Sequence, residues 1–351
     1  MENGDYTERT GAPFTGERLQ RLKEFLRREA LSYDDGIEWT VELFTADDAP
    51  AGTASLQGNI IKCVAVAEDN RGEGLSGRLL TAVQREAFQR GCGHLFLYTK
   101  PQNGAMFRKL GFYPVAGTDE VLMMENRKNG VGRFVESIRS AKKGGRIGAV
   151  VANCNPFTNG HRYLMETAAG QCDLLYIFVL SEEKSLFPAE VRLRLVREGT
   201  ADLANAVVCP TEDYLISSAT FPTYFLKDDA QADRIQCDLD LQIFGRQFAP
   251  KLGITKRFVG TEPLDRVTAA YNRRMKQVLP LFGIEVVEVE RVRAGGAPVS
   301  ASRVRALLRG GDPAAVRGLV PECTYRFLCS PQGRKIIDAG KSGFFLLFCP
   351  L

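Results

Sequence analysis

Two side chains suited to phosphate chemistry, Thr158 and His161, stand three residues apart in the segment NPFTNGHRYL. An apolar run ends near Asn153, and a helix is predicted to begin between Thr158 and His161, so both side chains would face one side of its first turn. A helix N-terminus leaves N–H groups unpaired and carries about half a positive charge, which makes phosphate its natural ligand. His161 could then donate a hydrogen bond to an α-phosphate oxygen while negative charge builds there during attack.

Two further segments bring a cation and a glycine to the ends of apolar runs. Lys184 lies in SEEKSLFPAEVR, behind the run DLLYIFVL and ahead of a helix entered by Pro188. Its attraction to phosphate would be strong only in a site that excludes water. The segment VGTEPL ends another apolar run at Gly260, and a glycine there allows the backbone to approach a nucleotide closely.

A fourth segment, VSASRVRALL, carries hydroxyl groups and cations at another predicted helix start. Ser300 and Ser302 come first, and Arg303 and Arg305 follow within the helix. Hydroxyls and helix N–H groups can hold phosphate groups, and an arginine can neutralise their charge. All four segments are predicted at strand-to-helix junctions, where doubly wound sheets bind their ligands.

The elements that would position these residues alternate between strand and helix. Apolar runs at 147–152, 173–180, 257–260 and 284–289 alternate with helical patterns that begin near 159, 188 and 302. Apolar strands separated by helices predict a parallel sheet covered on both faces. The second half of the chain is therefore predicted to be a doubly wound α/β domain.

The first half predicts a separate α+β unit, complete by about residue 125. A helical pattern over 17–31 precedes strand-like runs at 37–45 and 58–67. The second run leads into NRGEGLSG, a glycine-rich turn that opens a long amphipathic helix, and a strand at 94–100 and a short helix follow. This turn offers helix N–H groups to a pyrophosphate.

Composition describes an ordinary soluble chain of two domains. The 351 residues are 44% hydrophobic and 25% charged, and the formal charge of +4 gives no case for nucleic acid or a membrane surface. Nine cysteines are scattered without a C-x-x-C pair, which favours a reducing cytoplasm over a disulfide framework or zinc site.

The predicted divisions follow from the polar stretch ENRKNGVGRFVESIRSAKKGGR. We expect a first domain over 1–126, a linker with a short helix over 127–145, a second domain over 146–335 and an apolar tail over 336–351. The N-terminus has no signal-peptide pattern, and SGFFLLFCPL is too short for a bilayer crossing, which needs about twenty residues.

In the second half, T-x-G-H after a first apolar strand resembles the phosphate-binding motif of the HIGH-type nucleotidylyltransferase superfamily, and SASRVR resembles its I-S-S-T-x-[IV]-R motif, with Ala301 in place of a serine. The resemblance implies a Rossmann-like fold and attack on the α-phosphate of ATP. It implies catalytic roles for Thr158, His161, Lys184, Ser302 and Arg305. It implies nucleotide contacts from Asn155, Pro156, Phe157, Gly160, Gly260, Thr261, Glu262, Ser300 and Arg303.

In the first half, R-x-x-G-x-S resembles the R/Q-x-x-G-x-G/A motif of GCN5-related N-acetyltransferases, with Ser76 at the last position. The resemblance implies that this unit binds a coenzyme A-type arm. The implied contacts come from Val64, Val66, Arg71, Gly72, Gly74, Ser76, Gly77 and Asn103. Tyr113 as an acid and Glu68 as a base are candidates for acetyl transfer, and His94 is interpreted as structural.

The fusion of the two halves resembles the citrate lyase ligase family, also called citrate lyase synthetases. The resemblance implies a cytoplasmic enzyme that converts acetate and ATP, bound with Mg²⁺, to acetyl-adenylate and pyrophosphate. The acetyl group would then pass to the thiol of the dephospho-coenzyme A-derived arm on the citrate lyase acyl carrier subunit. No metal cluster or tightly bound cofactor is predicted. The alternatives are an adenylyltransferase with a phosphate acceptor, fused to an active N-acetyltransferase, and a non-catalytic coenzyme A or nucleotide sensor.

Overall fold

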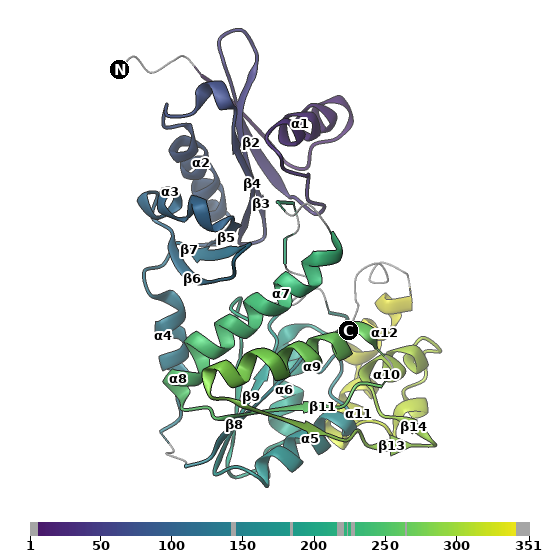
Figure 1. Ribbon diagram of the computed structural model, residues 1–351. Helices are drawn as coiled ribbons and strands as arrows, with labels where there is room; N and C mark the ends of the chain where they lie inside the picture. The colour runs from purple at the N-terminus through teal and green to yellow at the C-terminus, as the bar shows by residue number, and fades with distance from the viewer. Residues whose placement is uncertain are drawn as a thin grey trace. The chain divides into compact units, whose positions relative to one another are not determined.

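The protein divides into two compact units, each built around its own sheet (Figure 1). The computed structural model describes residues 6–141, 145–182, 185–215, 221–222, 224–225, 229–263 and 265–341. The first unit comprises 1–130 together with 221–235, and the second comprises 131–220 together with 236–351. The sequence did not suggest that a segment from the second half folds with the first unit, and the domain limits predicted above remain a proposal.

The first unit contains a seven-stranded sheet in the order β1-β2-β3-β4-β5-β7-β6. Neighbouring strands are antiparallel except for the parallel pair β4 and β5. The strands are β1 (Thr7–Gly11), β2 (Trp39–Phe44), β3 (Pro50–Gln57), β4 (Ile60–Val66), β5 (Phe96–Thr99), β6 (Tyr113–Gly117) and β7 (Leu122–Glu125). The helices are α1 (Gly16–Arg28), α2 (Leu75–Gln89) and α3 (Gly104–Lys109).

The parallel pair β4 and β5 separates soon after it forms. The register joins Ile60 to Phe96 and Ile61 to Leu97 and extends no further, although β4 continues to Val66 and β5 to Thr99. The two strands therefore leave a wedge-shaped gap between their carboxyl halves. The helix α2 begins beyond the end of β4 and buries its apolar face against the sheet, as its amphipathic pattern predicts.

The second unit contains a five-stranded, fully parallel sheet in the order β10-β9-β8-β11-β12. Its strands are β8 (Ile147–Ala152), β9 (Leu174–Val179), β10 (Ala206–Pro210), β11 (Lys256–Gly260) and β12 (Glu285–Val289), and a hairpin joins β13 (Arg293–Ala294) to β14 (Ala297–Pro298). Its helices are α4 (Gly130–Ser137), α5 (Asn159–Ala169), α6 (Ala189–Gly199), α8 (Ala249–Leu252), α9 (Arg266–Val278), α10 (Ala301–Leu308), α11 (Glu322–Cys329) and α12 (Pro331–Lys341), and α7 (Asp229–Ile243) belongs partly to each unit.

The strand β9 shows why this sheet is covered on both faces. Its six residues, LLYIFV, are all buried. Successive side chains point to opposite faces of a sheet. Leu175 and Ile177 join the core formed with α5, α6 and α10, whereas Phe178 packs edge-on against Phe244 and Phe248 in the segment between α7 and α8. The doubly wound parallel sheet predicted from the alternating pattern is confirmed.

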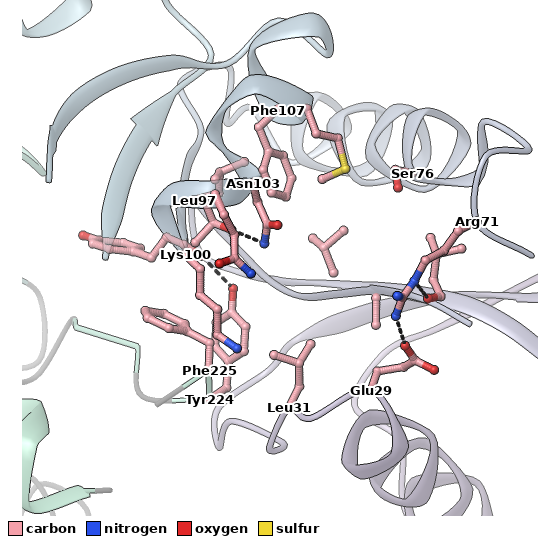
Figure 2. Close-up of a pocket in the computed structure, with 17 residues that line it drawn as sticks. Glu29, Leu31, Arg71, Ser76, Leu97, Lys100, Asn103, Phe107, Tyr224 and Phe225 are labelled. Atoms are coloured by element: carbon pink, nitrogen blue, oxygen red, sulfur yellow. Dashed lines mark hydrogen bonds and ion pairs between the residues drawn. The ribbon is translucent and has the colours of Figure 1, made fainter. Parts of the chain in front are cut away.

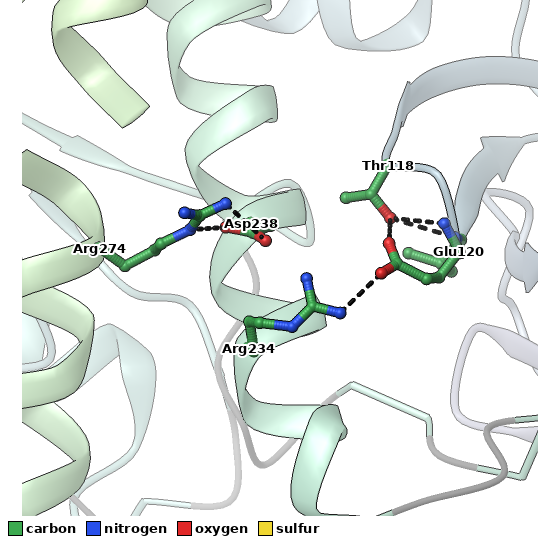
Figure 3. A network of polar contacts seen from close by, with 6 residues as sticks. Thr118, Glu120, Arg234, Asp238 and Arg274 are labelled. Carbon is green, nitrogen blue, oxygen red and sulfur yellow. Dashed lines mark hydrogen bonds and ion pairs between the residues drawn. The ribbon is translucent and has the colours of Figure 1, made fainter. Parts of the chain in front are cut away.

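The helix α7 contains the division between the two units, which falls between Ile235 and Gln236. In the first unit, Arg234 pairs with Glu120 at 2.6 Å and holds the pKa of that carboxyl below its usual range. In the second unit, Asp238 pairs with Arg274 of α9. Figure 3 shows both pairs, which anchor successive turns of one helix.

The two ends of the described chain show no membrane segment. Within residues 6–341, apart from the short gaps given above, no helix is long and apolar enough to cross a bilayer. Residues 336–341 of the predicted apolar tail belong to α12, and 342–351 lie outside the described residues.

Candidate nucleotide site

A cavity of about 230 Å³ lies in the second unit where the strand order changes direction. From β8 the chain adds β9 and β10 on one side and then β11 and β12 on the other, so the carboxyl ends of β8 and β11 flank a switch point. Ligands of open parallel sheets bind at such a point. The lining includes eight of the predicted residues, namely Asn155, Thr158, Gly160, His161, Gly260, Glu262, Ser300 and Arg305.

His161 is held at the start of α5 by reciprocal hydrogen bonds with the N-cap residue Thr158. The His161 N–H donates to Thr158 Oγ1 at 3.3 Å, and the Thr158 N–H donates to His161 Nδ1 at 3.1 Å. Since Nδ1 accepts a hydrogen bond from the Thr158 N–H, the neutral ring carries its own proton on Nε2. Nε2 is thereby the ring atom available to donate a hydrogen bond to a ligand.

The surroundings of His161 keep its imidazole neutral. Burial, together with the nearby positive charges of Arg291 and Arg305, lowers its pKa from 6.5 to about 4. The ring also stacks over Phe157, with centroids 6.2 Å apart and planes inclined by 15°. A neutral donor in a cavity also lined by Arg291 and Arg305 can stabilise charge that develops on a bound anion without changing its own protonation state.

A second helix start faces the same cavity, at the beginning of α10. The N-cap Ser300 accepts a hydrogen bond from the Arg303 N–H at 3.2 Å, and its Oγ lies 3.2 Å from Ser302 Oγ. The starts of α5 and α10 approach closely because Gly160 has no side chain: a Cβ there would lie 2.7 Å from the carbonyl oxygen of Val299. Two sets of N-terminal amides therefore converge on one small volume.

Two arginines supply the positive charge of this cavity. Arg305, on α10, lines it and donates to the carbonyl oxygen of Asn155 at 2.5 Å. Arg291, directly behind β12, also lines it and is ion-paired with Glu262. Sequence reasoning missed Arg291, although its position after an apolar strand at the switch point was a signal that could have identified it.

The loop behind β9 is organised by a buried arginine that sequence reasoning also missed. Arg192 of α6 is fully buried. Its guanidinium donates to the carbonyl oxygens of Phe187 at 2.8 Å, Asn153 at 2.9 Å and Leu180 at 2.6 Å, and to that of Glu182. Arg192 therefore ties the end of β8 to both sides of the loop 180–187. The predicted catalytic residue Lys184 belongs to this loop and lies outside the described residues.

Five predicted residues are not brought to the cavity wall. Phe157 is fully buried beneath His161, and the neighbouring Pro156 is also buried. The Thr261 N–H donates to the Val289 carbonyl at 2.9 Å. Arg303 holds the β13–β14 hairpin through the carbonyl oxygens of Ala294 and Ala297. The fifth residue, Ser302, reaches the site only through Ser300, as described above.

A second cavity, of about 400 Å³, occupies the wedge between β4 and β5 in the first unit (Figure 2). It is lined by the predicted residues Val64, Val66, Arg71, Ser76 and Asn103. The predicted glycines Gly72, Gly74 and Gly77 are not among the lining residues. Gly74 instead forms the N-cap of α2 with φ of 78°, a conformation that favours glycine. Arg71 is ion-paired with Glu29 at 2.7 Å beside the cavity.

The candidate residues for acetyl transfer lie away from this cavity. Neither Glu68 nor Tyr113 is among the described residues that line it. His94 lies just before β5, and its Nε2 is 2.8 Å from Oε2 of buried Glu125. This contact fits the interpretation of His94 as a structural residue. Within the described part of the chain, no three His, Cys, Asp or Glu side chains are grouped in a way that could hold a metal ion.

Comparison with known proteins assigns both halves of the chain. Residues 147–328 match the family "Citrate lyase ligase C-terminal domain", and residues 6–112 match the "Acetyltransferase (GNAT) family". The chain is 43% identical to citrate (pro-3S)-lyase ligase of Escherichia coli (strain K12), over 89% of this chain and 90% of that protein. It is 38% identical to the Haemophilus influenzae ligase of the same name, over 89% and 95%.

A more distant relative matches a smaller part of the chain. Phosphopantetheine adenylyltransferase of Streptococcus pyogenes serotype M1 is 25% identical over 112 residues, which cover 30% of this chain and 69% of that protein. The first unit therefore has the acetyltransferase-like fold and the second the nucleotidylyltransferase-like fold. Family models match both halves of the chain, and the chain is 38–43% identical to these ligases over 89% of its length. It therefore belongs to the citrate lyase ligase family.

Proposed function

We propose that this chain activates acetate with MgATP and transfers the acetyl group to the thiol arm of the citrate lyase acyl carrier subunit. Family membership supports the overall activity. The observation that supports the chemical mechanism is the hydrogen bond from the Thr158 N–H to His161 Nδ1, which leaves Nε2 as the ring donor in a cavity lined also by Arg291, Arg305 and a second helix start. These groups suit the α-phosphate of a nucleotide, whose negative charge grows during attack.

In the first step, an acetate oxygen attacks the α-phosphorus of ATP. A new O–P bond forms, the bond to the β-phosphate oxygen breaks, and pyrophosphate leaves with its magnesium. His161 and the start of α5 stabilise the charge on the pentacoordinate phosphorus, and Arg305 and the start of α10 hold the outer phosphates. In this proposal Lys184, on the loop anchored by Arg192, orients acetate against the nucleotide.

In the second step, the thiol sulfur attacks the carbonyl carbon of acetyl-adenylate. The C–S bond forms, the bond to the AMP oxygen breaks, and the thiol proton passes to solvent. The cavity of the first unit binds the dephospho-coenzyme A-derived arm, with Arg71, Ser76 and the start of α2 near its pyrophosphate. Binding the arm on the chain that also holds the adenylate raises the local concentration of the thiol, and such a conversion to an intramolecular step can contribute up to about 7–11 kcal/mol in favourable systems.

An exchange assay tests the first step. We expect acetate-dependent exchange of radioactive pyrophosphate into ATP, and its loss in His161→Ala. His94→Ala is the matched control, since His94 is the other histidine of the chain and lies in the first unit. Pyrophosphate exchange that does not depend on acetate but requires 4′-phosphopantetheine would instead support an adenylyltransferase. Absence of any ATP turnover would support a nucleotide sensor.

Mass measurement of the carrier subunit tests the second step. Incubation with ATP, acetate and thiol-form citrate lyase should add one acetyl group to the carrier arm. Omission of either ATP or acetate should leave the carrier mass unchanged. Acetylation that persists without ATP when acetyl-coenzyme A is supplied would contradict the adenylate route and identify the first unit as an active acetyltransferase.

A further inference from the structure

The cavity of the first unit has one wall that comes from a distant part of the sequence. Tyr224 and Phe225, in the segment after β10, line it together with residues of β4 and β5. The Tyr224 hydroxyl donates to the carbonyl oxygen of Tyr98 on β5 at 3.0 Å, and the Tyr224 carbonyl accepts from the Ser32 N–H at 2.7 Å. Tyr224 therefore spans the wedge and is fixed at both its ring and its backbone.

Neighbouring aromatic rings hold this wall in place. Phe225 packs edge-on against Tyr224 at 5.1 Å between centroids, and Phe221 packs edge-on against Tyr98 at 5.8 Å. Phe221, Tyr224 and Phe225 are all at least nine-tenths buried. Aromatic side chains packed in this way lose little freedom on folding and define a rigid boundary.

The two ends of the cavity differ in chemistry (Figure 2). Arg71 and Ser76 lie at one end, near the start of α2, where an anionic group is favoured. Tyr224 and Phe225 lie at the other end, with Lys100 and with Asn103, whose amide donates to Thr99 Oγ1 at 3.1 Å. A ligand with an anionic head and an uncharged tail would therefore place the end of its tail against the aromatic wall.

Among the described residues, the aromatic end has no carboxylate or imidazole to activate an amine, and Lys100 is its charged side chain. Among the described lining residues the one carboxylate is Glu29, which pairs with Arg71 at the opposite end, and there is no histidine. The Tyr224 hydroxyl is already donated to Tyr98, and burial raises the pKa of Tyr224 well above its usual value. This end of the cavity is therefore better suited to binding the tail of the arm than to transferring an acyl group from it to an amine.

We propose that Tyr224 and Phe225 close the inner end of the arm pocket and restrict its tail to a free thiol or a small acyl thioester. This inference rests on the proposed binding of a coenzyme A-type arm and adds the residues that set the size of the accepted tail. The pocket is then a holding site that accepts the substrate thiol and the acetyl product and excludes bulky S-acyl groups, and the arm leaves it to meet the adenylate.

Calorimetric titration of the full chain with three probes tests this proposal. The probes are dephospho-coenzyme A, its S-acetyl derivative and its S-benzoyl derivative. We expect the wild type to bind the first two with similar affinity and the third at least tenfold more weakly. In Tyr224→Ala and Phe225→Ala, the S-benzoyl probe should gain at least tenfold relative to the S-acetyl probe, because the removed ring leaves space for it.

Two further variants distinguish the effect of the removed ring from an effect on folding. Tyr224→Phe keeps the ring and loses only the hydrogen bond to Tyr98, so it should keep the wild-type discrimination. Phe88→Ala removes an aromatic ring that is 77% exposed on α2 and should bind all three probes as the wild type does. Circular dichroism and ATP binding by each variant report whether the two units remain folded.

The outcomes distinguish this inference from the function on which it rests. If wild-type protein binds none of the three probes, the proposed arm pocket fails, and the proposed closure fails with it. If it binds all three with equal affinity, arm binding stands and closure by Tyr224 and Phe225 is refuted. Discrimination that persists unchanged in folded Phe225→Ala and Tyr224→Ala would also overturn the proposal, since other residues would then set the limit.

Discussion

The backbone N–H of Thr158 and the ring nitrogen Nδ1 of His161 lie 3.1 Å apart and form a hydrogen bond at the first turn of α5. An imidazolium has no free acceptor at Nδ1, so protonation of His161 would break this bond and leave a buried N–H without its partner. The same contact that positions the ring therefore also selects its neutral Nε2–H tautomer.

We expect His161 to stay neutral down to about pH 4. Burial and the nearby Arg291 and Arg305 lower its pKa to about 4, below the ordinary value of 6.5, so between these values the unfolded chain binds more protons than the folded one. Stability should then fall as the pH decreases from about 6.5 to 4, by up to about 3 kcal/mol from this residue. Nitrogen-15 NMR of His94→Gln, in which His161 is the remaining histidine, measures the titration directly. A midpoint near 6.5 would contradict the buried, neutral assignment.

Gly160→Ala should weaken ATP binding at least tenfold, or about 1.4 kcal/mol. The new Cβ would lie 2.7 Å from the Val299 carbonyl oxygen, so the starts of α5 and α10 would have to move apart. Gly170→Ala, at the end of the same helix, is the control because its Cβ would meet its nearest atoms at 3.7 Å. Equal ATP affinity in both variants would show that the close approach of the two helices does not shape the site.

Arg192→Lys should lower the free energy of unfolding by about 3 kcal/mol, because several buried carbonyl oxygens lose their donors. Urea unfolding checks the stability, and pyrophosphate exchange checks whether the loop 180–187 still supports activity. Arg197→Lys is the control on the same helix, where the side chain is exposed. An Arg192 variant as stable and active as the Arg197 variant would remove Arg192 from its positioning role.

The two arginines of α10 should behave differently when replaced by methionine. Arg305→Met should reduce the exchange rate on the order of a hundredfold, because the cation lines the nucleotide cavity. Arg303→Met should cost about 1 kcal/mol of stability, because its side chain holds the β13–β14 hairpin, and should reduce exchange by less than tenfold. The reverse order of the two exchange rates would reassign their roles.

The strands with long apolar runs were predictable, whereas β3 was not. Its sequence, PAGTASLQ, consists mostly of small and polar residues with Leu56 as its one large apolar side chain, yet its inner six residues are buried. Thr53 is buried because its hydroxyl donates to the Val41 carbonyl at 3.1 Å, and Ser55 because it bonds Thr40 at 2.9 Å. Side-chain hydrogen bonds to neighbouring strands thus remove the cost of burial, and this compensation cannot be recognised from residue types alone.

The residues of the candidate site likewise include some that the sequence predicts and some that it does not. Thr158, His161, Ser300 and Arg305 were predictable because helix starts leave a local signature in the sequence. Arg192 was not, since it lies two positions from exposed Arg194 in RLRLV, and only the tertiary structure separates the buried arginine from the solvated one. Asp238, on α7, was missed for a related reason: its burial depends on an arginine that is distant in sequence.

The position of Tyr224 in the chain has a consequence for the order in which the protein matures. A ribosome that has completed the first 130 residues has made every strand of the seven-stranded sheet, but the aromatic lining contributed by Tyr224 and Phe225 has yet to be synthesised. The nascent acetyltransferase-like unit thus exposes an open wedge until almost a hundred more residues have followed. A fragment that ends at residue 130 would therefore lack Tyr224 and Phe225, and its wedge between β4 and β5 would stay open.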